Sequence, residues 1–174
     1  MFYVEEAVSG VAQLGNVVYV IVLTTAYYSI IKMYTADTLV PLGEGIHVEG
    51  MSYPSDIVAC HRDHQLYIAD FNYCIWRVSA DDHSYMKWLP SDPLDTLDVY
   101  TFSLRSRHLL VTSDSRTVRQ YSTSDRQLLR VVELPSYMGE LHHAVETPRG
   151  TFVICHQDTS HNHEEQHAVS GLFF

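Results

Sequence analysis

The sequence has few basic residues. Lys and Arg together number 11, against 21 Asp and Glu in 174 residues, so the formal net charge is −10. Binding to a nucleic-acid backbone needs clustered Lys and Arg. The longest basic candidate, RQYSTSDRQLLR at 119–130, is interrupted by Asp125. The charge balance therefore argues against a nucleic-acid partner.

Cysteine is also scarce. Cys60, Cys74 and Cys155 are an odd set with no C-x-x-C pair, so neither a disulfide framework nor a zinc knuckle is indicated. The N-terminus carries Glu5 and Glu6 where a secretory signal would have a basic region. These features favour a reducing, cytoplasmic setting.

No apolar run is long enough to suggest a membrane helix. The longest, VVYVIVLTTAYYSII at 17–31, falls short of the roughly 18–20 residues that span a bilayer. Its β-branched and aromatic content predicts two strands joined by a short turn. Glycine-rich phosphate loops, G-x-S-x-G and kinase signatures are likewise missing from the sequence, so no cofactor is indicated.

The sequence does contain a repeat of about 43 residues, in which short apolar runs recur in four series. The first series is VYVIV (18–22), LYIAD (66–70), LLVTS (109–113) and TFVIC (151–155). The second is GVAQL (10–14), DIVAC (56–60), YTFSL (100–104) and HHAVE (142–146). The third is IIKMY (30–34), IWRVS (75–79), VRQYS (118–122) and HAVSG (167–171). The fourth is TLVPL (38–42), MKWLP (86–90) and RVVELP (130–135).

Four β-rich runs per 40–45 residues are typical of a β-propeller blade. A small sheet with two apolar faces must stack on neighbours to bury both, which accounts for continuous apolar runs in place of clean alternation. The alternative is an all-β sandwich with coincidental spacing. We expect an all-β chain of about four four-stranded antiparallel blades. The approximate blade limits are 10–50, 51–92, 93–136 and 137–174 of one partial propeller domain, with 1–9 a candidate strand of a preceding blade.

The second unit, PSDIVACHRDHQLYIADFNYCIWRVS at 54–79, resembles the NHL repeat. Cys74 replaces the Arg that usually precedes the last Ile of that pattern, the loop after Asp70 is one residue short, and the third unit has Ser113 at the Asp position. The resemblance implies blades of a six-membered ring, of which this chain would be an incomplete or open arc. The residues at matching places are Pro54, Ile57, Leu66, Tyr67, Ile68, Ala69, Asp70, Asn72 and Ile75.

Asp70 and Asn72 are predicted to be structural. The Asp70 carboxylate, at a strand end, can accept backbone N–H bonds of the following tight loop. Asn72 tolerates the left-handed conformation that such a loop needs. We expect Trp76 and Trp88 to pack between blades.

The string HEEQH at 163–167 matches the H-E-x-x-H zinc-protease motif. That chemistry requires a helix that places His163, Glu164 and His167 on one face, but residues 156–166 are polar throughout and fall between two predicted strands. We therefore interpret 156–166 as an enlarged hairpin loop. Its candidate partner-contacting residues are His156, Gln157, Asp158, His161 and His163, and any metal site in it would use His156, His161, His163 and His167.

The function expected from the sequence is a non-enzymatic, NHL-like propeller module that binds another protein. Two alternatives stay open: a Ca- or Zn-dependent propeller hydrolase or lyase, with acidic turns at 79–83 and 91–98 as oxygen donors, and an RNA-binding NHL propeller. Fold alone does not separate them. Because an open arc leaves exposed strand edges, we also expect missing blades or self-association.

Overall fold

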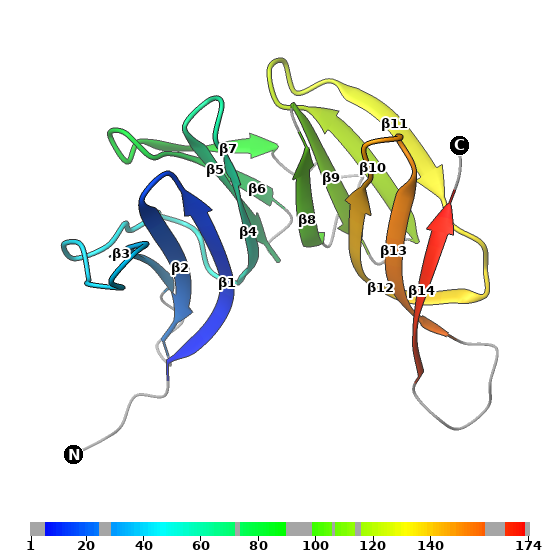
Figure 1. The fold of residues 1–174 in the computed structure, drawn as a ribbon, viewed down its shortest axis with the longest axis horizontal. Coiled ribbons are helices and arrows are strands. Elements are labelled where there is room, and N and C mark those ends of the chain that lie inside the picture. Colours follow the sequence, from blue (N-terminus) through cyan, green and yellow to red (C-terminus); the bar gives the residue numbers. More distant parts are fainter. Residues whose placement is uncertain are drawn as a thin grey trace. The chain divides into compact units, whose positions relative to one another are not determined.

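The computed structural model describes residues 6–24, 29–71, 74–89, 99–105, 107–113, 116–158 and 166–172. All regular elements in these ranges are antiparallel β-strands, which form four small sheets (Figure 1). The expectation of an all-β chain is confirmed. None of the described segments is a helix of the length and hydropathy that crossing a membrane requires. The chain divides into two compact units, Met1–Leu94 and Asp95–Phe174, with two sheets in each.

The first unit holds a three-stranded and a four-stranded sheet. The strands of the first sheet are β1 (Ala7–Leu14), β2 (Val17–Leu23) and β3 (Ser29–Thr35). Those of the second are β4 (Pro54–Cys60), β5 (Gln65–Asp70), β6 (Cys74–Ser79) and β7 (Tyr85–Leu89). In both sheets each strand pairs with the next along the chain, as short hairpin connections dictate.

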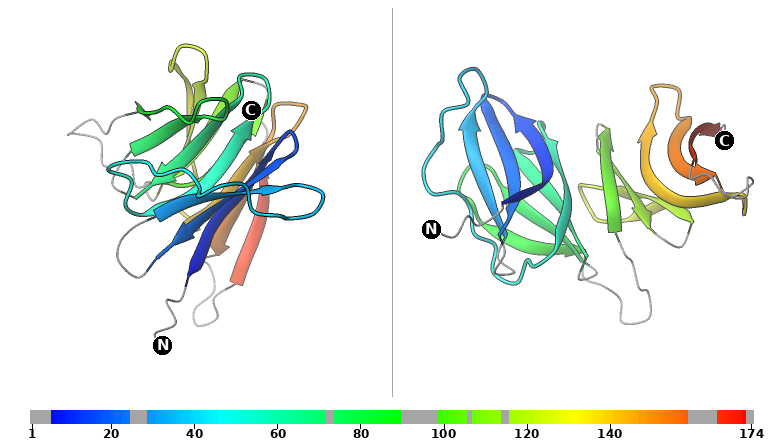
Figure 2. Two further views of the ribbon diagram at one scale, coloured as in Figure 1. Left: turned by 90° about the vertical axis from the view of Figure 1, so that its left-hand side faces the viewer. Right: turned by 90° about the horizontal axis from the view of Figure 1, so that it is seen from below.

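The second unit repeats this plan in the opposite order of sheet size. Its four-stranded sheet contains β8 (Val99–Arg105), β9 (His108–Ser113), β10 (Thr117–Ser122) and β11 (Leu128–Glu133). Its three-stranded sheet contains β12 (Met138–Glu146), β13 (Phe152–Asp158) and β14 (Gln166–Leu172). The strands of the three-stranded sheet, orange to red, curve visibly in the right-hand view of Figure 2, as expected from the twist of antiparallel strands.

Of the apolar runs predicted to be strands, only TLVPL (38–42) is not one. This segment makes an isolated bridge from Pro41 to Tyr34 and a backbone bond from Leu42 N to Met33 O, 2.8 Å. Pro41 has no N–H to donate to a ladder. Leu39 has φ 53° and Gly43 φ 68°, both outside the extended region. The position of a fourth strand is therefore occupied by an irregular segment.

Residues 7–9, expected to belong to a preceding unit, lie in strand β1, and Ala7 and Val8 pair with β2 of the same sheet. The first strand of every sheet carries a register irregularity, between Val8 and Gly10, Pro54 and Asp56, Val99 and Thr101, and Leu141 and His143. The same bulge in the same strand is a structural repeat that accompanies the sequence repeat.

The two sheets of the first unit pack face to face around one apolar cluster. Ile21, Ile31, Leu66 and Ile68 are completely buried in it. A Cβ on Gly10 would lie 3.0 Å from Ile57 Cγ2 and 3.1 Å from Ile57 N, so β1 can approach β4 this closely only because residue 10 is Gly. Each fully buried Val, Leu or Ile side chain stabilises the fold by roughly 1.5–3 kcal/mol.

The second unit has its own core, formed between its two sheets. Phe152 and Ile154 of β13 and Val118 of β10 are completely buried there. A polar junction adjoins it: Gln120 Nε2 donates to Glu146 Oε2 at 2.9 Å, and His108 Nδ1 lies 3.9 Å from the same oxygen. These contacts connect strands β9 and β10 to β12 across the sheet interface, so we interpret them as structural.

Candidate functional site

The loop predicted at 156–166 begins later than the sequence suggested. His156, Gln157 and Asp158 continue strand β13, and Asp158 pairs with Gln166 of β14. His156 is 1% exposed, because the inward alternation of Phe152 and Ile154 extends through it. The placement of His156 in an exposed, partner-contacting loop was therefore wrong.

The remaining predicted loop residues add no site that can be described. His161, His163 and Glu164 lie outside the described residues, and His167 is known only as a backbone position in β14. Among the side chains that the structure does describe, no group of three or more His, Cys, Asp or Glu is placed to hold a metal ion. The zinc-protease string at 163–167 thus begins outside the described residues and ends in a strand.

Asp70 is completely buried at the end of β5. Its carboxylate accepts hydrogen bonds from Ser52 N (3.2 Å), Tyr53 N (3.1 Å) and Trp76 Nε1 (2.9 Å). The sequence predicted a structural role through the loop that follows Asp70. Two of the bonds described also hold the chain that enters β4, 17 and 18 residues upstream. Asn72, the other residue predicted to be structural, lies outside the described residues.

Both tryptophans are buried in the second sheet. Trp88 is completely buried and meets Tyr67 edge-on at a centroid distance of 5.1 Å. Trp76 belongs to the cluster between the two sheets of the first unit. Burial also raises the pKa of the neighbouring Cys74 thiol to about 11, with a smaller contribution from the Asp70 carboxylate, so this thiol is not a nucleophile near neutral pH.

Among the described residues, an exposed apolar surface lies on the side of the first sheet that faces away from the core of its unit. We call it the valine face and define it by five valines of β1 and β2 together with two flanking residues: Val8, Val11, Val18, Val20, Val22, Tyr34 and Leu39. Cross-strand pairing places the valines on one face, since Val8 opposes Val22 and Val11 opposes Val20. The left-hand view of Figure 2 looks onto this sheet.

The valine face is hollowed: Val8, Val11 and Leu39 are exposed, Val18, Val20 and Tyr34 are half-buried, and Val22 is buried with 3% exposure. Val8 is 60% exposed, Val11 57% and Leu39 63%. Val8, Val18, Val20, Val22, Tyr34 and Leu39, with Glu6, line a hollow of about 310 Å³. Contiguous exposed apolar patches on soluble domains mark interaction sites, whereas scattered apolar residues do not. This face is the candidate functional site of the described residues.

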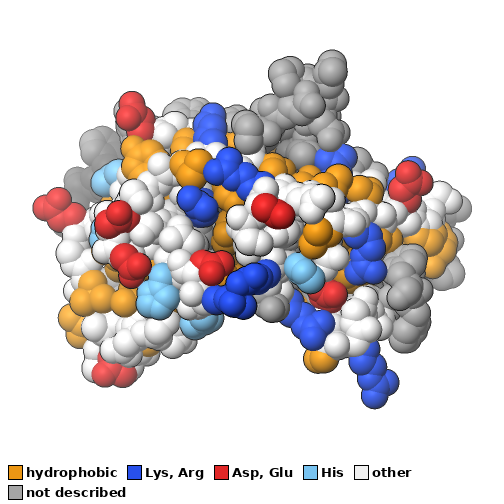
Figure 3. All heavy atoms as spheres, turned by 90° about the horizontal axis from the view of Figure 1, so that it is seen from above, with side chains coloured by type: hydrophobic (Ala, Val, Ile, Leu, Met, Phe, Trp, Pro, Cys, Tyr) orange, Lys and Arg blue, Asp and Glu red, His pale blue; other side chains and the backbone are white. Residues whose placement is uncertain are grey.

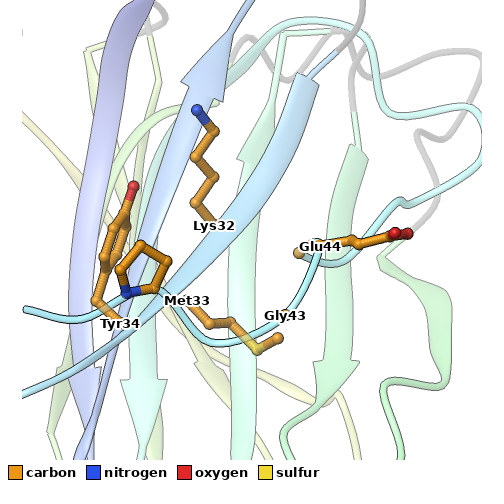
Figure 4. Close-up of a pocket in the computed structure, with 7 residues that line it drawn as sticks. Lys32, Met33, Tyr34, Gly43 and Glu44 are labelled. Carbon is orange, nitrogen blue, oxygen red and sulfur yellow. The ribbon is translucent and has the colours of Figure 1, made fainter.

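One ion pair crosses the edge of the face. Lys32 Nζ lies 2.7 Å and 2.9 Å from the two carboxylate oxygens of Glu6, and this hydrogen bonding raises the pKa of Lys32. A second hollow, of about 210 Å³, lies between β3 and residues 41–45 and shares Tyr34 with the first. Figure 4 shows the Lys32 ammonium and the Glu44 carboxylate pointing away from each other in this hollow.

Sequence reasoning did not identify the valine face because VYVIV (18–22) was interpreted as a strand covered on both sides. A usable signal was present in β1, where Val8 and Val11 stand among Ala7, Ser9 and Gln13. That composition is more polar than the run LYIAD of β5, in which every residue is buried. A strand with small and polar residues beside its valines is typical of a sheet with one uncovered face.

These observations define the class of protein: an all-β chain of small antiparallel sheets, with an exposed apolar face on the first of them. No known protein family matches the chain, and no curated protein matches it. One of the solved structures that resemble it is the crystal structure of the computationally designed Ika4 protein, with a TM-score of 0.62 and 11% sequence identity, covering 97% of this chain and 93% of that one. At this identity the likeness concerns the fold alone.

Proposed function

We propose that the protein is a non-enzymatic, NHL-like β-propeller module that binds another protein through the valine face. The observation that carries the binding role is the open apolar hollow lined by Val8, Val18, Val20 and Leu39. Contiguous apolar surface of this kind, rimmed by polar residues, is typical of sites that contact another protein.

The propeller part of the proposal rests on the repeat. Four small sheets follow one another along the chain, and each has its strands in sequential order. In the first unit β1 lies beside β4, and in the second β8 lies beside β12, so the first strands of successive sheets are neighbours in both units. This is the arrangement expected where blades stack around an axis. The resemblance of 54–79 to the NHL repeat supports the same assignment.

The proposed binding role is tested by selecting peptides that bind the full chain from a random 12-residue display library. We expect enriched peptides to lose binding to the Val20→Asp variant and to keep binding to Val131→Asp. Val131 is a matched control, because it is a strand valine that is 47% exposed but lies in β11 of the other unit. Peptides that tolerate Val20→Asp would refute the assignment of the site. Circular dichroism of both variants confirms that each is folded.

A further inference from the structure

The charges around the valine face indicate the chemistry of its partner. Glu6 lines the apolar hollow, Glu44 lines the adjoining hollow, and Asp37 is two residues from Leu39. Glu6, Asp37 and Glu44 are all exposed. The rim of the face is therefore acidic.

Almost no positive charge offsets this rim. Lys32 is the sole Lys or Arg among residues 1–61, whereas the same stretch contains Glu5, Glu6, Asp37, Glu44, Glu49 and Asp56. The ion pair of Lys32 with Glu6 carries no net charge, so the negative charge of the rim comes from Asp37 and Glu44. On the face shown in Figure 3, Lys and Arg side chains lie among acidic ones. Residues 1–61, which contain the whole first sheet, thus carry an excess of acidic over basic residues.

The form of the face favours a flat, extended partner. Val8, Val11, Val18 and Val20 lie on a twisted three-stranded sheet, and the opposite side of that sheet is already covered by another sheet in the same unit. Apolar sheet faces pack well on extended segments whose side chains alternate between apolar and polar, because the apolar set then points to one side.

We infer that the valine face binds a basic, extended polypeptide segment with alternating apolar residues flanked by Lys or Arg. This inference rests on the proposed protein-binding role. Apolar contacts supply the affinity, and the acidic rim selects partners with basic flanks and speeds association. A second copy of this chain is a poorer occupant, since each copy carries a net charge of −10 and like charges oppose association.

The test uses two synthetic peptides with the same alternating Val-Thr centre, one flanked by two Lys at each end and its twin flanked by Glu. Binding to the full chain is measured by calorimetry at low and high NaCl. We expect the Lys peptide to bind about tenfold more tightly than its twin at low salt, and the difference to shrink at high salt, where charges are screened. Glu44→Gln should reduce the difference in affinity between the Lys peptide and the Glu peptide. Val11→Thr should weaken the binding of both peptides about tenfold. Val131→Thr, the matched control, should leave the affinities of both peptides unchanged.

The outcomes separate the two proposals. If both peptides bind equally and both depend on Val11, the inference about charge is wrong and the binding role stands. If neither peptide binds, or if Val11→Thr has no effect, both fail. Light scattering of the chain without peptide tests whether a second copy covers the face. A dimer that dissociates in the Val11→Thr variant would show that it does, and would overturn the inference.

Discussion

Removal of the Asp70 carboxylate should destabilise the first unit more than any change of a surface charge. In Asp70→Ala, the backbone N–H groups of Ser52 and Tyr53 and the indole N–H of Trp76 lose an acceptor. A buried donor without a partner costs about 1–3 kcal/mol. Tyr53 is 47% exposed, so water can reach part of this segment. The cost for each of the two backbone N–H groups is therefore at the lower end of this range, about 1 kcal/mol.

The expected loss of unfolding free energy is therefore about 3–4 kcal/mol for Asp70→Ala and about 2 kcal/mol for Asp70→Asn, whose amide keeps one acceptor oxygen. Trp76→Phe removes one of the donors. Because the two residues share a hydrogen bond, their effects should not add, and a double-mutant cycle should give a coupling of about 1 kcal/mol.

Urea unfolding followed by tryptophan fluorescence measures this effect. The chain has two tryptophans, Trp76 and Trp88, and both lie in the second sheet, so the signal reports on the first unit. The urea concentration at which half of the protein is unfolded should fall, and the dependence of the unfolding free energy on urea concentration should not change. Asp81→Asn is the control, since the Asp81 side chain is 74% exposed in its pair with His64 and exposed pairs contribute about 0–1 kcal/mol. If Asp70→Asn lowered the free energy of unfolding no more than Asp81→Asn, the hydrogen bonds that Asp70 accepts would not stabilise the fold.

Three further predictions follow from single contacts. Gly10→Ala should lower the free energy of unfolding by about 1–3 kcal/mol in the same urea assay, because its Cβ would press on Ile57; an unchanged midpoint would mean that the sheets can separate freely. Cys74 should resist iodoacetamide at pH 8 until urea unfolds the first unit. Its side chain is buried, and a pKa raised from 9.0 to about 11 leaves about 100-fold less thiolate. Labelling of Cys74 in the native protein, detected by mass spectrometry, would contradict this. His156→Ala should destabilise the second unit by about 1–3 kcal/mol, because the side chain is buried beside Ile154. The measurement is amide hydrogen exchange, which should become faster in β13. Unchanged exchange would show that the His156 side chain does not stabilise this unit.

The strands were largely predictable from the sequence because their signals are local. Runs such as LYIAD (66–70) and IWRVS (75–79) combine β-branched and aromatic residues with polar turns on both sides, and they are strands β5 and β6. TLVPL (38–42), the apolar run that is not a strand, also has a local cause. Its composition favours a strand, but Pro41 and the left-handed φ of Leu39 prevent one.

The site was harder to predict because exposure depends on which sheet covers which face. The pattern around 18–22 is apolar on both faces, and only the packing of β1 against β4 reveals that the inner face is covered while Val18 and Val20 line an open hollow. His156 shows the converse: a polar tract suggested a loop, but strand pairing with β14 extends β13 through it and buries the imidazole.

The sequence by itself therefore determined the strand content, the repeat of about 43 residues and the acidic balance, since each depends on residue type and spacing along the chain. Only the tertiary structure decided that Asp70 binds backbone groups 17 and 18 residues upstream, that His156 is buried, and that the valine face is open. These properties depend on which side chains from distant segments meet, and burial is set by those long-range contacts, which no local pattern encodes.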